Sequence, residues 1–192
     1  MKRKLHFLKK FRKISNPRKM PEKKLILSKE DIARRVQELG ATITKDYAGS
    51  NFLVVGVLNG AFMFMADLVR EIKLDLQVDF VRVASYGIST KSCGEIRFSK
   101  DVELDIKDRD ILIVEDIVDT GLTLACLHNY FNERGAKSVR TCALIDKKER
   151  REVKVSIEYV GFEVKEGFLI GYGLDCREQY RQFEEVFHLK KV

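Results

Sequence analysis

Residues 111–123, ILIVEDIVDTGLT, decide the expected fold of this chain. Four apolar residues followed by Glu115 are typical of a strand that is buried on both faces, and they lead into a polar turn at Gly121. The pattern of Leu122–Arg134 predicts a helix, which Gly135 ends. A strand, a glycine turn and a helix in this order are the repeating unit of α/β proteins with parallel sheets.

The same alternation of strands and helices extends in both directions from this stretch. Nearer the N-terminus, Ser28 can cap a helix with apolar residues at helical spacing, and Gly40 can end it. We expect further strands at 52–58, 78–85 and 139–145 and a further helix at 61–72. This order predicts an α/β fold with a mainly parallel, twisted sheet flanked by helices.

The charge distribution divides the chain into a basic extension and a body. Residues 1–24 hold 11 basic side chains and one acidic side chain, so the remainder carries −3 although the whole chain carries +7. We expect a flexible extension over 1–24 and a single domain over 25–192, with no charge bias toward nucleic acid in that domain. The extension fits a solvated tail, a segment that contacts a membrane or another polyanion, or an organellar transit peptide.

The cysteines and the longest uncharged stretch exclude two other classes of protein. Cys93, Cys126, Cys142 and Cys176 are far apart and lack the paired spacing of zinc ligands. Free thiols in a reducing compartment are the simplest interpretation, so we expect a cytoplasmic protein. Residues 47–66 carry no charge, but their glycines and polar residues fit a strand, a turn and a helix start better than a membrane span.

The turn after the central strand carries the residues best suited to chemistry. A glycine, the hydroxyls of Thr120 and Thr123 and the amides of a helix N-terminus together suit a phosphomonoester. Glu115 and Asp116 can accept hydrogen bonds from vicinal ribose hydroxyls and can hold Mg²⁺. The pattern therefore indicates a phosphorylated ribose with a metal ion. The alternative is an acidic cap before the helix, with Asp119 as N-cap.

The stretch ILIVEDIVDTGLT resembles the 5-phosphoribosyl 1-pyrophosphate (PRPP) motif of type I phosphoribosyltransferases. Other segments, in the same order, resemble the hypoxanthine-guanine members of that family. VGVLNGAFMFMADLVR is similar to their pyrophosphate loop and helix, and SYGISTKSCGEIRFSKD is similar to their mobile loop. ALIDKKERR, VGFEV and FLIGYGLDCREQYR are similar to their purine-binding elements. The resemblance runs from about residue 27 to the C-terminus and implies the type I fold, with a small hood formed from the chain ends.

The resemblance implies a role for each matched position. The implied ribose-phosphate site consists of Glu115, Asp116, Asp119, Thr120, Gly121, Leu122 and Thr123. The implied pyrophosphate site consists of Leu58, Asn59, Gly60, Ala61 and Arg181. The implied purine site consists of Lys147, Phe168, Leu169 and Asp175, and the closing loop contains Ser85 and Tyr86. The implied Mg²⁺ ligands are Glu115, Asp116 and Asp175.

The implied activity is purine salvage by a Mg²⁺-dependent transferase. The enzyme would move the 5-phosphoribosyl group from PRPP to N9 of hypoxanthine or guanine, giving IMP or GMP and pyrophosphate. Asp119 would accept the proton at purine N7, and Phe168 would stack on the ring. Lys147 would donate to the exocyclic oxygen, whereas the amino group of adenine would present it with a second donor. Family members are usually homodimers or homotetramers, so we expect a homo-oligomer.

The chain departs from the family pattern at Asn59, Ala61, Leu122 and Cys176, where relatives often have lysine, serine, a basic residue and tyrosine. We therefore expect phosphate binding to depend more on backbone amides and the two threonines. Two other functions remain open: a relative specialised for xanthine or another 6-oxopurine, and a regulator of the same fold that contacts nucleic acid through its extension. Three site residues also have structural interpretations. Phe168 could begin an ordinary strand, Lys147 could lie in a solvated turn and Arg181 could lie on a surface helix.

Overall fold

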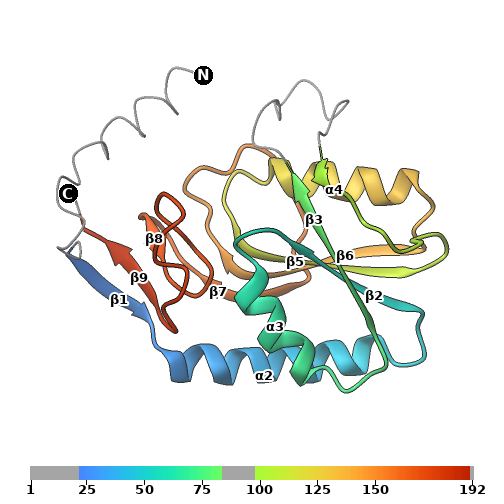
Figure 1. Cartoon of the computed structure of the whole chain (residues 1–192), viewed down its shortest axis with the longest axis horizontal. Helices are drawn as coiled ribbons and strands as arrows, with labels where there is room; N and C mark the ends of the chain where they lie inside the picture. Colours follow the sequence, from blue (N-terminus) through green and yellow to red (C-terminus); the bar gives the residue numbers. More distant parts are fainter. Residues whose placement is uncertain (1–21, 84–97, 191–192) are drawn as a thin grey trace.

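The computed structural model describes residues 22–83 and 98–190, and a six-stranded sheet forms its centre (Figure 1). The sheet order is β4-β3-β2-β5-β6-β7. Its strands are β2 (Phe52–Val57), β3 (Gln77–Val83), β4 (Phe98–Lys100), β5 (Asp110–Val118), β6 (Ser138–Asp146) and β7 (Tyr159–Glu163). Every neighbouring pair is parallel except β3 with β4. The predicted mainly parallel sheet is therefore confirmed.

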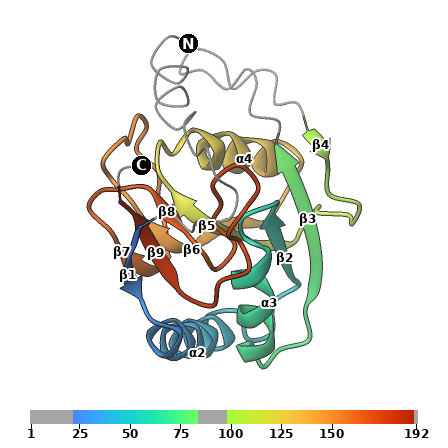
Figure 2. The same cartoon turned by 60° about the vertical axis from the view of Figure 1, so that its left-hand side comes forward.

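Helices cover both faces of the sheet, as Figure 2 shows. Helices α2 (Lys29–Asp46) and α3 (Phe62–Glu71) lie on one face, and α4 (Leu122–Glu133) lies on the other. Strand β5 contributes side chains to the apolar cores on both faces of the sheet. Leu112 and Val114 pack in the core with α2 and α3, and Ile111 and Ile113 pack in the core with α4. Alternate side chains of a strand point to opposite faces, so the continuous apolar run follows from burial on both sides.

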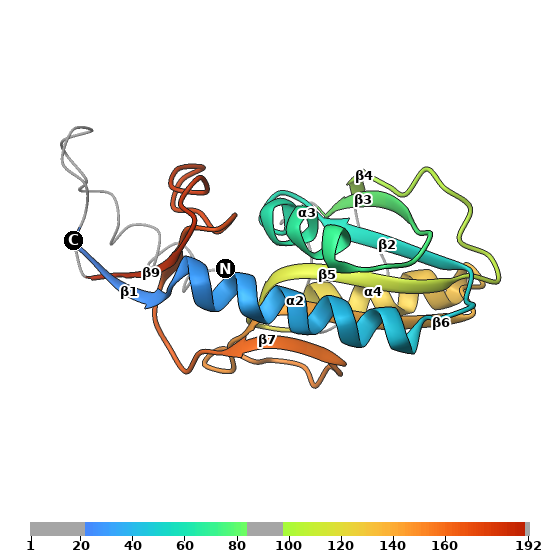
Figure 3. The ribbon, with the colours of Figure 1, turned by 90° about the horizontal axis from the view of Figure 1, so that it is seen from below.

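A second, three-stranded sheet forms a hood at one end of the molecule (Figure 3). Its antiparallel strands lie in the order β1 (Lys23–Leu27), β9 (Val186–Leu189) and β8 (Leu169–Ile170), so both ends of the described chain build it. The hood expected from the resemblance is confirmed. Strand β1 begins two residues before the boundary expected from charge. Lys23 belongs to the folded hood because its ammonium lies 3.9 and 3.5 Å from the ring centroids of Phe183 and Phe187.

Two expected element ends are wrong. Helix α2 continues through Gly40 to Asp46. Gly40 is needed for packing instead, because a Cβ there would press against Glu71 at the end of α3. Strand β5 continues beyond Glu115 to Val118, because its pairing with β6 persists to the last residue.

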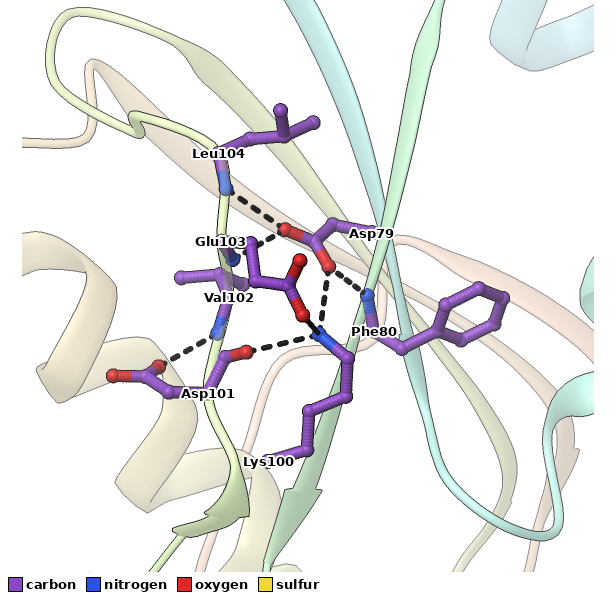
Figure 4. Close-up of polar contacts among 7 residues, drawn as sticks. All are labelled: Asp79, Phe80, Lys100, Asp101, Val102, Glu103 and Leu104. Atoms are coloured by element: carbon purple, nitrogen blue, oxygen red, sulfur yellow. Dashed lines mark hydrogen bonds and ion pairs between the residues drawn. The ribbon is translucent and has the colours of Figure 1, made fainter.

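A buried carboxylate fixes the chain that returns from β4 against β3 (Figure 4). Asp79 is 6% exposed and accepts hydrogen bonds from the amides of Glu103 and Leu104, at 2.6 and 3.0 Å. The Lys100 ammonium lies 3.1 Å from the other carboxylate oxygen, which also accepts from the Phe80 amide. Burial acts to raise the pKa of Asp79, but the three amides and the ammonium outweigh it and leave the pKa below its ordinary value.

The cysteines agree only in part with the free-thiol interpretation. Cys142 and Cys176 are free and buried, whereas Cys126 is disulfide-bonded, so the interpretation is wrong for that residue. Cys176 packs with Ile170 and Leu189 in the small apolar core of the hood. Within 22–83 and 98–190, no helix has the length and apolar character needed to cross a membrane.

Candidate active site

Four loops meet at the carboxyl ends of the parallel strands. Three of them follow β2, β5 and β6, which are neighbours in the sheet, and the fourth is residues 171–181 of the hood. Ligands of open α/β sheets bind at this edge. Most of the residues assigned from the sequence lie on these four loops or at the strand ends that lead into them.

Glu115 and Asp116 form a crowded acidic pair in the second half of β5. One carboxylate oxygen of Glu115 is buried and has no hydrogen-bond partner among the described residues. Burial raises the pKa of Glu115 well above its ordinary value, and the neighbouring Asp116 carboxylate raises it further. Burial also raises the pKa of Asp116 to about 6, although the Ile117 amide and Arg181 oppose the rise. Such a pair favours a ligand that supplies positive charge or hydrogen-bond donors.

The donor set at this edge fits Mg²⁺ bound together with substrate. No group of three or more histidine, cysteine or acidic side chains gathers as a metal site in the described parts of the chain. Mg²⁺ commonly uses one or two carboxylates and takes its remaining ligands from phosphate oxygens and water. Glu115, with its unpartnered oxygen, and the neighbouring Asp116 supply two such carboxylates.

The turn at the start of α4 has the form expected of a phosphate cradle. Gly121 is the N-cap residue and has a φ of 82°, a conformation that favours glycine, and a Cβ there would lie 2.8 Å from the Val153 carbonyl oxygen. The N-cap residue has no side chain to cap the helix, and the first turn of the helix holds no acidic residue. The amide of Leu122 donates to the Thr120 hydroxyl at 3.3 Å. The alternative with Asp119 as N-cap is therefore wrong.

Asp119 is held between two basic side chains that follow β6. One carboxylate oxygen contacts Arg150 and lies 3.9 Å from the Lys147 ammonium. The other oxygen is buried without a hydrogen-bond partner among the described residues. Arg151 fixes the backbone by donating to the Asp119 carbonyl oxygen at 2.9 Å. The second oxygen is thus available to a proton or a donor on a ligand.

Lys147 lies inside the protein, although it begins the charged run KKERR. It is 4% exposed, and its amide donates to the Val118 carbonyl oxygen at 3.0 Å. Its ammonium lies 3.0 Å from Glu149, which also accepts from the Gly167 amide at 3.3 Å. The hydrogen bond from Lys147 lowers the pKa of Glu149. The solvated-turn interpretation of Lys147 is therefore wrong, and the contact joins this loop to the segment that leads into β8.

The expected stacking segment belongs to the hood. Leu169 begins β8 and is 6% exposed, and Phe168 packs against the apolar core of the hood. The Phe168 carbonyl oxygen accepts from the Leu189 amide at 2.9 Å. Strand formation and a role in binding are thus compatible, since pairing with β9 fixes the backbone from which Phe168 projects.

The loop after β2 touches both the acidic pair and the hood. A Cβ at Gly60 would overlap the Asp116 carboxylate, and a Cβ at Gly173 would overlap the Gly60 carbonyl oxygen. The peptide bond between Leu58 and Asn59 is cis. Ala61 is fully buried at the start of α3. Glycine is therefore required at 60 and 173 for the two loops to approach each other.

Arg181 lies on the loop 171–181 and not on a helix, so the surface-helix interpretation is wrong. It donates to the Gly173 carbonyl oxygen at 2.7 Å and pairs with Asp175 at 2.9 Å and Glu178 at 2.8 Å. Its positive charge also acts to lower the pKa of Asp116. The charges of Arg181 and Asp175 both act on the pKa of Asp116, so the loop 171–181 lies near the acidic pair of β5.

Three site residues have no counterpart among the sequence-based assignments. Glu149, Arg150 and Glu178 contact Lys147, Asp119 and Arg181, respectively. Each lies in a charged, loop-like stretch that local sequence does not distinguish from surface. Ser85 and Tyr86, assigned to the closing loop, lie outside the described residues, so that assignment stays a prediction.

Comparison with known proteins identifies the family to which the chain belongs. Residues 24–177 match the family described as phosphoribosyl transferase domain. The chain therefore belongs to the phosphoribosyl transferase domain family, and the recognition made from its motifs is confirmed.

Individual relatives carry a more specific name. The chain is 46% identical over 167 residues to a hypoxanthine-guanine phosphoribosyltransferase of Bacillus subtilis, a match that covers 87% of this chain and 93% of the relative. It is 47% identical over 165 residues to one of Aquifex aeolicus, with 85% and 93% covered. A crystal structure of a hypoxanthine phosphoribosyltransferase from Staphylococcus aureus superposes with a TM-score of 0.82 at 41% identity, over 87% of this chain and 91% of that one.

Proposed function

We propose that this chain is a hypoxanthine-guanine phosphoribosyltransferase of purine salvage. It would transfer the 5-phosphoribosyl group of PRPP to N9 of hypoxanthine or guanine, with Mg²⁺, and release IMP or GMP and pyrophosphate. The observation that carries the proposal is the position of Lys147, whose buried ammonium lies 3.9 Å from the carboxylate of Asp119, just after the end of β5. The relatives at 46% and 47% identity, which bear this enzyme's name, support it.

The ribose and its 5′-phosphate would occupy the end of β5 and the start of α4. Glu115 and Asp116 would accept hydrogen bonds from the two ribose hydroxyls, which would give a donor to the buried Glu115 oxygen that lacks one. The phosphate would bind the amides that follow Gly121 and the hydroxyls of Thr120 and Thr123. Leu122 would contribute its amide, so this part of the site would need no basic side chain.

The pyrophosphate group would lie between residues 58–61 and 171–181. Loop 58–61 offers backbone amides but no charged side chain, so Arg181 would supply the main fixed positive charge. Mg²⁺ held by Glu115, Asp116 and Asp175 would neutralise the charge that develops on the departing pyrophosphate. The raised pKa of the β5 pair is consistent with a place for this cation.

The purine would bind between Lys147, Asp119 and Phe168. The Lys147 ammonium has three hydrogens, so it can keep its bond to Glu149 and still donate to the exocyclic oxygen of a 6-oxopurine. The backbone of Leu169 and the side chain of Asp175 would contact the edge of the base. Adenine would place an amino group against the ammonium. Because both groups are hydrogen-bond donors, neither would find an acceptor.

Asp119 would serve as the general base. As N9 of the purine bonds to the anomeric carbon, the proton at N7 becomes more acidic and needs an acceptor within hydrogen-bond reach. The buried oxygen of Asp119 without a partner can take that proton, while Arg150 holds the other oxygen. Exclusion of water by a closing loop that includes Ser85 and Tyr86 would protect the ribosyl centre from hydrolysis.

The remaining proposals concern the location of the protein, its oligomeric state and its basic extension. We propose a cytoplasmic homodimer or homotetramer that binds PRPP and 6-oxopurines. The basic extension would contact a membrane or another polyanion, and the net charge of −3 over the remainder gives that part no bias toward nucleic acid.

Product identification tests the proposal directly. The full chain is incubated with PRPP and hypoxanthine, guanine or xanthine, with Mg²⁺ or with excess EDTA, and the nucleotides are separated by chromatography. We expect IMP and GMP with Mg²⁺ and neither with EDTA. Formation of xanthosine monophosphate alone would favour the xanthine-specialised relative, and absence of every nucleotide would refute the proposed activity.

A further inference from the structure

Glu178 lies where the two loops of the proposed pyrophosphate site meet. Its carboxylate accepts a hydrogen bond from Arg181 at 2.8 Å. The hydrogen bond and the charge of Arg181, helped by the charge of Arg82, hold the pKa of Glu178 below its ordinary value, so the group is an anion at neutral pH. The protein therefore already contains one anion on the donors that pyrophosphate would use.

Arg181 does not need Glu178 in order to keep its position. One guanidinium nitrogen donates to the Gly173 carbonyl oxygen at 2.7 Å, and the other lies 2.9 Å from Asp175. These contacts fix both ends of the guanidinium fork. A role for Glu178 as a support for Arg181 would thus duplicate contacts that are already present.

Of the two carboxylates that pair with Arg181, Glu178 can move away from the guanidinium more easily than Asp175. Its side chain is 71% exposed, whereas the Asp175 side chain is 30% exposed and accepts from the Glu178 amide at 2.8 Å. An exposed ion pair contributes little, so rotation of the Glu178 side chain into water costs little. Asp175, by contrast, is held by the backbone.

We propose that the Glu178 carboxylate is an internal competitor of pyrophosphate, which occupies Arg181 in the free protein and is displaced when pyrophosphate binds. This inference rests on the proposed function, since it takes the site between residues 58–61 and 171–181 to hold pyrophosphate. Glu178 then weakens pyrophosphate binding and favours release of this product. Asn59 is uncharged, and loop 58–61 holds no lysine that could attract pyrophosphate in its place. Competition by Glu178 therefore weakens mainly the contact between pyrophosphate and Arg181.

The test is the affinity of the full chain for Mg²⁺-pyrophosphate, measured by calorimetry and as product inhibition of the transferase reaction. In Glu178→Gln we expect the Kd and the inhibition constant to fall by about two- to fivefold, the range for one exposed ion pair. The KM for hypoxanthine should stay at the wild-type value. Glu184→Gln is the matched control, because Glu184 is an exposed carboxylate just beyond the loop 171–181 and pairs with Lys29 on α2. Its pyrophosphate Kd should equal that of wild type.

A double-mutant cycle shows whether Glu178 acts through Arg181. In an Arg181→Gln background, Glu178→Gln should leave the pyrophosphate Kd unchanged, so that the effect seen in the wild-type background is lost. Glu178→Ala, measured in parallel, provides the same comparison if the glutamine variant folds poorly. A Kd that is unchanged or raised in an active Glu178 variant would overturn the inference and leave the proposed function standing. A wild-type chain that neither turns over nor binds pyrophosphate would overturn both.

Discussion

Replacement of Lys147 by methionine should selectively weaken purine binding. Methionine retains most of the aliphatic stem, which matters because Lys147 is 4% exposed, but it removes the ammonium that would donate to the purine oxygen. A hydrogen bond that involves a charged group contributes about 1.5–3 kcal/mol. Loss of that bond corresponds to an increase of about 10- to 100-fold in the KM for hypoxanthine or guanine. The KM for PRPP should change much less, since Lys147 is not among the proposed PRPP ligands.

Steady-state pyrophosphate release at saturating PRPP, with the purine varied, measures this effect. Lys148→Met is the matched control, because Lys148 is the adjacent lysine but is 62% exposed and pairs with Asp146 and Glu163. Thermal melting of both variants checks that they are folded. If the purine KM of Lys147→Met equals that of Lys148→Met, the assignment of Lys147 to the purine oxygen is refuted.

Three further predictions concern catalysis, the loop contact and stability. Asp119→Asn should lower kcat by about 10²- to 10⁴-fold with little change in PRPP affinity, and near-normal turnover would exclude Asp119 as the base. Gly60→Ala should raise the KM for PRPP about tenfold or more, because its Cβ overlaps Asp116, while the far-UV circular dichroism spectrum stays that of wild type. Asp79→Asn should lower the free energy of unfolding by about 2 kcal/mol, since it weakens the bonds from Lys100 and the amides. The pKa of Asp79 is lowered by folding, so this stabilisation is present above about pH 4 and disappears as the pH falls further; a urea-unfolding difference that grows in acid would contradict it.

The sheet was predictable because its central strands are buried on both faces. Such strands are continuous apolar runs, and FLVVGV of β2 and ILIV of β5 are conspicuous in a chain with 34% charged residues. The ends of the elements were less predictable. Gly40 looks like a helix stop, but it lies within α2 because the end of α3 passes close to it, and no local pattern records that contact.

The site was predictable to the extent that its residues lie in one contiguous motif. Glu115 to Thr123 are adjacent in sequence, so their shared chemistry shows without a structure. Glu149, Arg150 and Glu178 become part of the site only through folding, which brings the loops after β5 and β6 and residues 171–181 together. Lys147 shows the same limit, since its charged run predicts exposure and only tertiary packing buries it.

The central claim is most directly tested by Mg²⁺-dependent pyrophosphate release from PRPP with hypoxanthine, guanine, xanthine and adenine supplied separately. We expect turnover with hypoxanthine and guanine and none with adenine, because the buried Lys147 ammonium needs an acceptor at position 6 of the purine. The rate with xanthine then defines the range of 6-oxopurines used. Turnover with adenine at the rate of hypoxanthine, or PRPP binding without turnover of any base, would contradict the assignment of this chain as a hypoxanthine-guanine phosphoribosyltransferase.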